Sequence, residues 1–500
     1  MTVFAVLSGP LPKLGVVVLG LLAAGAILDV EPRRRALWML GALVLSPALL
    51  LADIWHSPQL HFVHHHPLYA AVGAVLALTL LGVAATLIAR RPWLTAPLAV
   101  LALPFRVPIE SGGTTSNLLV PLYFVVAAAA LAEIVPALRE DRPGPEAPAR
   151  RWVERLLALY VVLYAIQATY SVDFKDALQN MVFFYVPFAL LFTMLRRLHW
   201  TRELIVMCLQ VVVPLAIVFA CIGFVEYDTK TLLLNPKLIA ANNLHTYFTV
   251  NSVFFDPDIF GRFLALVMIA LAAVLIHARD RRTAIGTTVI LAILWGGLVL
   301  TLSRSSMAAL LVGLGILAAL RWKVWPVLAT AGVVVVIGAI ALAVSPNTFG
   351  LNQGLNGASS GRANLVTGGL SMFGDEPLYG YGSGAFIDEY KQQHPLASKT
   401  LSASHTIPIT IAAEQGLIGL LAYLALVIAA VIALLRGTRA DPIRATIAAA
   451  FVALVFHTML YADFLEDPVT WALLGIGCAL AITAPLGRGD PAPEPAAIAA

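Results

Sequence analysis

The chain has few charged residues and very few cysteines. Only 12% of its 500 residues are Asp, Glu, Lys or Arg, about half the share that is usual in a soluble domain. Its three cysteines, Cys208, Cys221 and Cys478, lie inside apolar stretches and form no CxxC pair, which argues against a disulfide framework. The formal net charge of +4 gives no indication of a nucleic-acid partner.

Long apolar stretches make up most of the remaining sequence. Hydrophobic residues account for 60% of the chain, and many uncharged stretches are long enough to cross a hydrocarbon core of about 30 Å. The sequence therefore predicts an all-α polytopic membrane protein with about 12–15 transmembrane helices. The predicted spans are 14–30, 36–54, 68–89, 93–109, 118–138, 153–170, 178–195, 204–222, 259–277, 284–302, 305–320, 324–345, 409–435, 445–462 and 469–485. The span 93–109 contains four prolines or adjoins them, which predicts a broken or re-entrant helix.

Arginines gather in alternate connections between these spans. They include Arg33–Arg35, Arg90–Arg91, Arg196–Arg197, and Arg279 with Arg281 and Arg282. Because short cytoplasmic loops carry the excess of basic residues, this set is predicted to be cytoplasmic. The N-terminus is then outside, and the long connections 223–258 and 346–408 face outwards.

Composition divides the chain into six regions. They are N-terminal transmembrane helices (1–138), a Pro/Ala-rich cytoplasmic linker (139–152), central transmembrane helices with the outer loop 223–258 (153–345), a large periplasmic catalytic loop with short helices (346–408), C-terminal transmembrane helices (409–487) and a disordered cytoplasmic tail (488–500).

A few polar residues fall where charge is costly. Arg304, in TLSRSS, lies between two spans with almost no connection, where a snorkelling side chain is the alternative to a functional one. Arg362 follows a glycine in the large loop. The stretch PLYGYGSG supplies Gly380, Gly382 and Gly384, which either shape a turn-rich loop or bring backbone N–H groups to a ligand.

His405 lies just before the span at 409–435, and Glu414 lies in the first turns of that span. A lone histidine at a membrane boundary is more often structural than catalytic. For Glu414, a role in orienting a loop group and a simple buried polar contact remain open.

The order of these motifs resembles the O-antigen ligase/O-antigen polymerase superfamily of bacterial membrane glycosyltransferases. The motifs are SR between adjacent spans, GR in a large outer loop, PxxGxGSG, and SH followed by ExG; FFDPDIFGRFLAL (254–266) also resembles the family's entry to a span. The resemblance covers about residues 150–465. Thr406 stands where the family commonly has Asn, and Asp258 stands where it has the Asn of DPN.

The resemblance implies transfer of a glycan from undecaprenyl diphosphate on the periplasmic face of the inner membrane. The acceptor is another glycan, lipid A core or a protein. Arg304, Arg362 and Arg262 are the candidate diphosphate ligands, since guanidinium groups stay charged and bind phosphate oxygens in pairs. His405 is the candidate general base, Glu414 is the second candidate catalytic residue, and His394 and His245 are weaker competitors for the role of base. Inversion at the anomeric carbon and independence of metal cofactors are expected.

Two other functions remain open from the sequence. A transporter or flippase of polyprenyl-linked glycans would use a similar basic cavity, although no clear internal repeat is visible. A scaffold of a polysaccharide assembly complex would make His405 dispensable. The histidines of WHSPQLHFVHHHP, which are His56, His61, His64, His65 and His66, favour an interfacial loop over a metal site because no HExxH-like spacing is present. Asp256, Asp258, Asp375 and Glu376 are further conceivable cation ligands.

Overall fold

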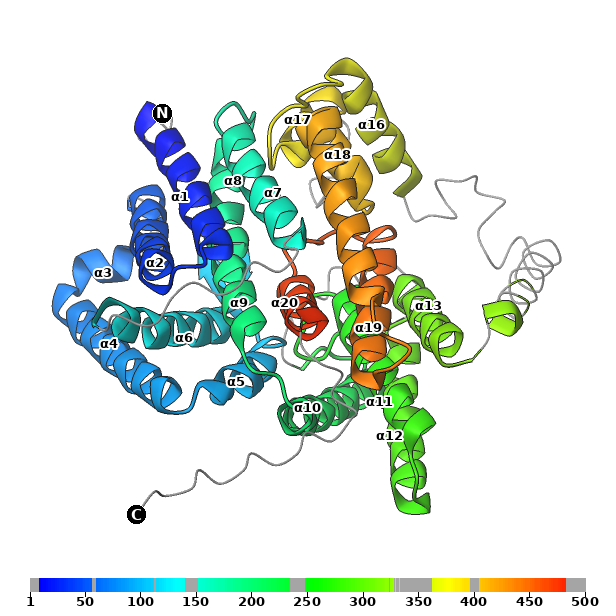
Figure 1. Ribbon diagram of the computed structural model, residues 1–500. Coiled ribbons are helices and arrows are strands. Elements are labelled where there is room, and N and C mark those ends of the chain that lie inside the picture. The colour runs from blue at the N-terminus through cyan, green and yellow to red at the C-terminus, as the bar shows by residue number, and fades with distance from the viewer. Residues whose placement is uncertain are drawn as a thin grey trace, which may run out of the picture.

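The computed structural model is a bundle of helices, with α18 and α19 near its middle (Figure 1). It describes residues 9–55, 60–111, 114–139, 152–233, 248–322, 324–327, 329, 332, 362–395 and 404–482. Within these residues, 10 helices are long and apolar enough to cross a membrane. The predicted fold class, an all-α polytopic membrane protein, is confirmed.

The first half of the chain forms the helices from α1 to α10, of which α10 packs with helices of the second half. They are α1 Pro10–Leu28, α2 Pro32–Ile54, α3 His61–His65, α4 Pro67–Arg90, η2 Pro92–Leu94, α5 Thr95–Ala102, α6 Val120–Arg139, α7 Trp152–Ala168, α8 Phe174–Asn180, the π-helical turn η3 Met181–Tyr185, α9 Val186–Arg197 and α10 Arg202–Thr229. The predicted broken span 93–109 is indeed short: α5 ends at Ala102, and an antiparallel hairpin follows, formed by β1 Val107–Ser111 and β2 Thr114–Leu118.

The second half supplies the remaining helices. They are α11 Pro257–His277, α12 Arg281–Leu300, α13 Arg304–Arg321, α16 Arg362–Asp375, α17 Phe386–Gln393, α18 Ile407–Leu435, α19 Pro442–Thr458 and α20 Pro468–Ile482. Residues 362–395 of the predicted outer loop do carry two short helices, α16 and α17. The predicted span 324–345, the linker 139–152 and the tail 488–500 lie almost entirely outside the described residues.

Local sequence fixes where many helices begin. Proline is the first residue of α1, α2, α4, α11, α19 and α20, a position where its missing N–H has no helical partner to lose. Asp256, Thr201, Ser303 and Asp441 precede helices and accept hydrogen bonds from first-turn N–H groups. These N-caps satisfy donors that would otherwise be orphaned at the helix ends.

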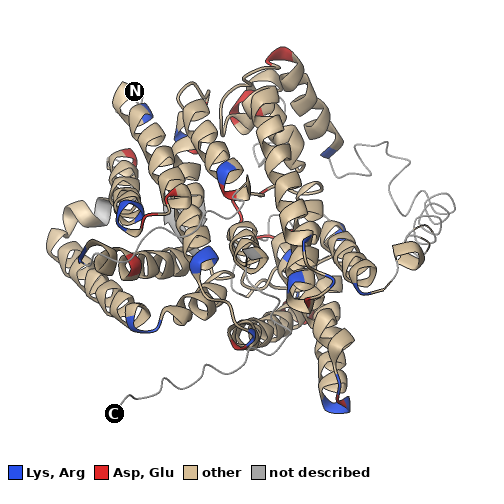
Figure 2. Ribbon diagram, in the orientation of Figure 1, with Lys and Arg blue, Asp and Glu red and all other residues tan. Residues whose placement is uncertain are grey.

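Packing in the bundle relies on small residues, as expected where lipid removes the hydrophobic drive between helices. A Cβ added to Gly20 of α1 would lie 2.6 Å from Cβ of Ala165 in α7, so the two helices pack almost backbone to backbone. One apolar core joins α1, α2, α6, α7 and α9 to α18 and α20, and a second joins α10–α13 to α19. Charged residues are sparse along the ribbons (Figure 2), so the few buried ones stand out.

Candidate active site

The glycine-rich segment 377–385, between α16 and α17, is held against the turn that joins α7 to α8. Tyr170 donates its hydroxyl to the carbonyl oxygen of Tyr379 at 2.8 Å. Ser171 donates its hydroxyl to the carbonyl oxygen of Ser383 at 2.7 Å. Side chains from a much earlier region of the sequence therefore fix the shape of this loop.

The same segment is inserted into the hydrogen-bond ladder of α18. Gly416 adopts φ 62° and ψ −161° inside the helix, a conformation open almost only to glycine. At this break, Leu417 donates its N–H to the carbonyl of Pro377 at 2.8 Å, and Glu414 accepts the N–H of Gly382 at its carbonyl oxygen at 2.7 Å. The loop thus replaces helix hydrogen bonds that the break removes.

The three predicted loop-shaping glycines all have left-handed φ angles, 65° for Gly380, 96° for Gly382 and 74° for Gly384. A Cβ at Gly382 would lie 2.2 Å from Cα of Ser171. The N–H groups of all three donate to acceptors within the protein, two of them oxygens of Glu414. In this conformation the glycines serve close packing of the loop, and their N–H groups do not point to a ligand.

Glu414 is a buried connection between α18 and the loop. One carboxylate oxygen accepts the N–H of Gly384 at 2.9 Å, and the other accepts the N–H of Phe386 at 3.1 Å. Because Phe386 begins α17, the carboxylate satisfies a donor at the first turn of that helix. This geometry matches the loop-orienting alternative, since each carboxylate oxygen already accepts a backbone N–H of the loop.

His405 has an unusual backbone. Its φ is 57°, and a left-handed non-glycine residue stores roughly 1–3 kcal/mol of strain that its surroundings must offset. The hydroxyl of the buried Ser404 bonds both the N–H and the carbonyl oxygen of Thr406, at 3.1 and 2.8 Å. These hydrogen bonds join the residues on either side of His405 and so hold His405 in this conformation.

The imidazole of His405 is neutral at neutral pH. Its pKa is lowered from 6.5 to about 4, chiefly by burial and next by the positive charge of Arg362, while the carboxylate of Asp258 acts in the opposite direction. Its Nδ1 is buried without a hydrogen-bond partner among the described residues. A neutral imidazole with an unengaged nitrogen has the protonation state that a general base requires.

Arg362, at the start of α16, forms an ion pair with Asp258, near the start of α11, with Nη2 3.3 Å from Oδ2. The side chain of Arg362 is 38% exposed and that of Asp258 18%. The hydroxyls of Ser303 and Ser305 also donate to Asp258. Asp258 thereby joins α11, α13 and α16 at one point.

The neighbouring Asp256 shares this crowded environment. Burial, followed by the charge of Asp258, raises the pKa of Asp256 to about 6. Its carboxylate caps α11 by accepting the N–H of Asp258 at 2.6 Å.

Tyr461, between α19 and α20, lies at the centre of these groups. Its ring centroid is 5.9 Å from that of His405 and 5.5 Å from that of His457. The guanidinium carbon of Arg262 lies 5.9 Å from the same ring. We refer to His405, Arg362, Asp258, Tyr461 and Arg262 as the His405 site.

The two remaining predicted arginines differ in exposure. Arg262 is buried and pairs with Asp467 at 2.8 Å, both side chains being 4% exposed. With Arg106, it lines one end of an apolar cavity of about 210 Å³ enclosed by α5, α10, α11, α19 and α20. Arg304 is exposed at the first position of α13, between the two serines that bind Asp258.

Sequence reasoning missed His457, which lies in an apolar helix with no motif around it. Its Nε2 is 3.1 Å from Oγ of Ser306 and 3.3 Å from Oγ of Ser305. The SRSS stretch therefore supplies hydroxyls to both Asp258 and His457. The sequence shows the serines of SRSS, but it does not indicate that they contact Asp258 and His457, which are distant along the chain.

Within the residues that the structure describes, no group of three or more His, Cys, Asp or Glu side chains is suited to a metal ion. His64 packs edge-on against Trp55, with ring centroids 5.2 Å apart. The side chains of His56 and His61 lie outside the described residues, as does His245. His394, the other competing base, stacks on Tyr390 in α17.

Comparison with known families places this arrangement in context. The family described as O-antigen ligase matches residues 289–424, a segment that includes Arg304, Arg362, the three loop glycines, His405 and Glu414. Arg262 precedes it. None of the curated proteins matches the chain. The resemblance to the O-antigen ligase/polymerase superfamily is thus confirmed over residues 289–424, and the chain is a multi-pass membrane protein in which this segment is similar to the O-antigen ligase family.

Proposed function

We propose that this protein transfers a glycan from undecaprenyl diphosphate to an acceptor hydroxyl on the periplasmic face of the bacterial inner membrane. One observation carries the proposal. Within the segment that matches the O-antigen ligase family, a neutral, strained His405 and a part-exposed Arg362 lie near the same carboxylate, that of Asp258. A base and an arginine that binds phosphate are the two groups that this reaction needs.

The chemistry assigns one role to each group. The acceptor oxygen attacks the anomeric carbon while its proton passes to His405, and the bond from that carbon to the phosphate oxygen breaks. The electron pair leaves with undecaprenyl diphosphate, and direct displacement inverts the anomeric centre. Negative charge grows on the leaving diphosphate, where Arg362 and Arg304 stabilise it.

Arg262 fits a supporting part in this scheme. Its ion pair with Asp467 is buried, and both residues line the apolar cavity of about 210 Å³. A cavity with apolar walls and two arginines at one end suits the junction between a polyprenyl chain and its diphosphate. Glu414 is a positioning residue that keeps the 377–385 loop against α18.

Transfer by the purified protein in lipid vesicles tests the proposal. Wild type, His405→Ala and Arg304→Ala are compared at equal folded amounts, with a polyprenyl-diphosphate glycan as donor and glycan, lipid A core or peptide acceptors. Transfer by wild type and its near loss in both variants supports the assignment. Movement of the lipid-linked glycan across the bilayer without transfer would establish the transporter instead, and a chelator that abolishes transfer would contradict metal independence.

A further inference from the structure

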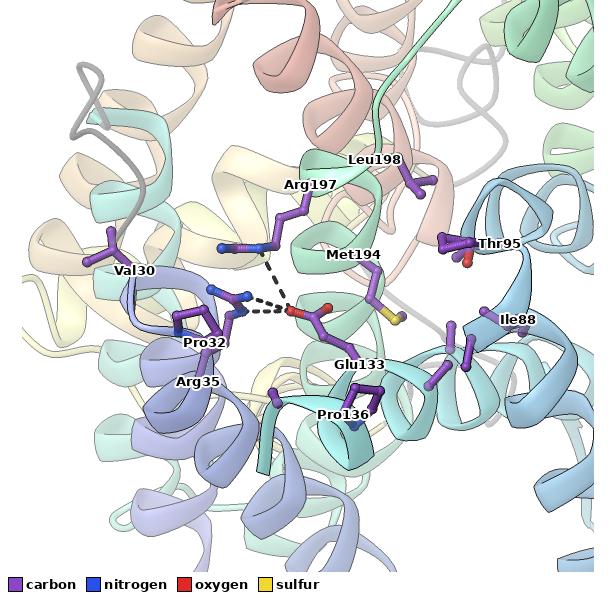
Figure 3. Close-up of a pocket in the computed structure, with 15 residues that line it drawn as sticks. Val30, Pro32, Arg35, Ile88, Thr95, Glu133, Pro136, Met194, Arg197 and Leu198 are labelled. Carbon is purple, nitrogen blue, oxygen red and sulfur yellow. Dashed lines mark hydrogen bonds and ion pairs between the residues drawn. The ribbon is translucent and has the colours of Figure 1, made fainter. Parts of the chain in front are cut away.

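A second cavity lies at the opposite end of the bundle from His405. His405 precedes the first turn of α18, whereas the last turn of α18 packs against Gly477 of α20, and Gly475 of the same helix packs against Leu195 near the end of α9. The turn before α8 holds the 377–385 loop, whereas α9 ends at Arg197 after 24 helical residues from Phe174, a rise of roughly 36 Å. The cavity has a volume of about 450 Å³. The α1–α2 connection and the ends of α4, α6 and α9 enclose it (Figure 3).

Two arginines and one glutamate from three different helices line this cavity. Arg35 is 5% exposed and holds one carboxylate oxygen of Glu133 with Nε at 2.8 Å and Nη2 at 2.7 Å. Nε of Arg197 lies 3.8 Å from the same oxygen, and Figure 3 shows both guanidinium groups directed at Glu133. The charged residues that line the cavity therefore carry a formal net charge of +1.

The surroundings of the cavity add a basic rim and apolar walls. Exposed arginines flank its lining residues in the chain: Arg33 and Arg34 at the start of α2, Arg90 and Arg91 at the end of α4, and Arg139 at the end of α6. Of these, Arg34 is neutralised by ion pairs with Asp29 and Glu31 at 3.3 and 2.7 Å. The walls themselves are largely apolar, with Pro32, Ile88, Pro136 and Met194 among them. Such a cavity favours a ligand with an anionic group and an apolar portion.

The outer face of α4 provides a place for that apolar portion. Leu76, Leu80, Val83 and Leu87 are all more than half exposed along this helix, which ends at the cavity with Ile88 and Ala89. In a membrane this face lies in the acyl-chain region. A free phosphate ion would make no use of it.

We propose that this cavity binds the phosphate headgroup of an anionic phospholipid from the leaflet opposite the His405 site, with the acyl chains along α4. Arg197 binds the phosphate oxygens, the buried Arg35 adds positive charge behind it, and Glu133 fixes the two guanidinium groups while reducing the affinity. In the proposed topology this leaflet is the cytoplasmic one, whose anionic lipids are attracted to basic pockets between helices.

Lipid binding to the purified full-length protein tests this site. Phosphatidylglycerol, phosphatidylcholine and inorganic phosphate are titrated separately in detergent micelles, and bound lipid is counted by native mass spectrometry. Phosphatidylglycerol is expected to bind best. Arg197→Gln should weaken its binding about five-fold, the effect of one basic residue at a membrane surface, and Glu133→Gln should strengthen it.

The control is Arg202→Gln, an exposed arginine at the start of α10 that does not line the cavity, and it should leave binding unchanged. Ala132→Leu narrows the cavity without changing its charge and should also weaken binding, which keeps the test decisive should Arg197→Gln fail to fold. Equal binding of both lipids, or phosphatidylglycerol binding that neither variant changes, overturns the proposal. Phosphate binding as tight as that of the lipid would replace it with a free-anion site.

Discussion

The guanidinium of Arg362 lies 3.3 Å from the carboxylate of Asp258, so the arginine proposed to receive the donor diphosphate is already paired with an anion. A diphosphate must compete with Asp258 for this guanidinium or share it. Asp258 in turn receives the hydroxyls of Ser303 and Ser305 on either side of Arg304. The carboxylate therefore holds the arginines in place at the expense of donor affinity.

Asp258→Asn is expected to lower the KM for the lipid-linked donor several-fold. The amide keeps the shape of the side chain and can still accept a hydroxyl, but it removes the competing charge. Steady-state transfer at varied donor concentration measures the effect. Asp280→Asn, a change of a helix N-cap in α12 away from the site, is the matched control, and an unchanged or raised KM for Asp258→Asn would count against Arg362 as a donor ligand.

His405→Ala should slow transfer about 10²–10⁴-fold, because the acceptor hydroxyl loses its proton acceptor. Folding should be retained, since alanine only removes bulk at a position where the backbone is already left-handed. Single-turnover transfer measures the rate. His394→Ala, which removes the competing base in the same loop, should retain transfer; the reverse result would move the base to His394.

The acid limb of the pH profile should lie well below the usual range for histidine. Since the pKa of His405 is lowered to about 4, the imidazole remains neutral as pH falls from about 7 to about 5, and kcat/KM should stay flat there. The same lowered pKa makes folding stability decline as pH falls from about 6.5 to about 4, because the unfolded chain then binds more protons. Short assays on folded protein separate the two effects.

Two changes identify the titrating group in this profile. Arg362→Gln should move the acid limb upwards, because a positive charge that opposes protonation of His405 is lost. Asp256→Asn removes the neighbouring carboxyl, whose pKa is raised to about 6, and should leave the limb in place. An acid limb near the pKa of Asp256 that disappears in Asp256→Asn would assign the titration to Asp256 instead.

The sequence was sufficient to predict the helix bundle, because transmembrane spans can be recognised by their apolar length. It also predicted the segments that carry the candidate site, because the motifs occur in a recognisable order along the chain. It was not sufficient for the partners. Nothing local to Asp258 indicates Arg362, 104 residues later, and nothing near His457 indicates the serines of SRSS. From the sequence, the N–H groups of Gly380, Gly382 and Gly384 could have served a ligand. Only the structure shows that they donate to oxygens of Glu376 and Glu414.

Glu414→Gln distinguishes a positioning role from a catalytic one. The amide can accept only one of the two N–H groups, of Gly384 and Phe386, and turns a donor towards the other. The loop should loosen, so thermal stability and transfer should fall together, by a similar factor for every acceptor. Transfer that slows about 10²-fold or more while the melting temperature is unchanged would instead show that the carboxylate takes part in the chemistry.

Gly382→Ala should destabilise the protein and lower transfer, because the new Cβ would lie 2.2 Å from Cα of Ser171 at a φ of 96°. Backbone conformations of this kind cost an alanine roughly 1–3 kcal/mol even before the clash. Gly374→Ala is the control, since its added Cβ meets nothing within 4 Å and alanine favours the helix α16. Melting temperature and transfer are measured on both, and a Gly382→Ala protein as stable and active as Gly374→Ala would show that the loop seen against the α7–α8 turn is not the active arrangement.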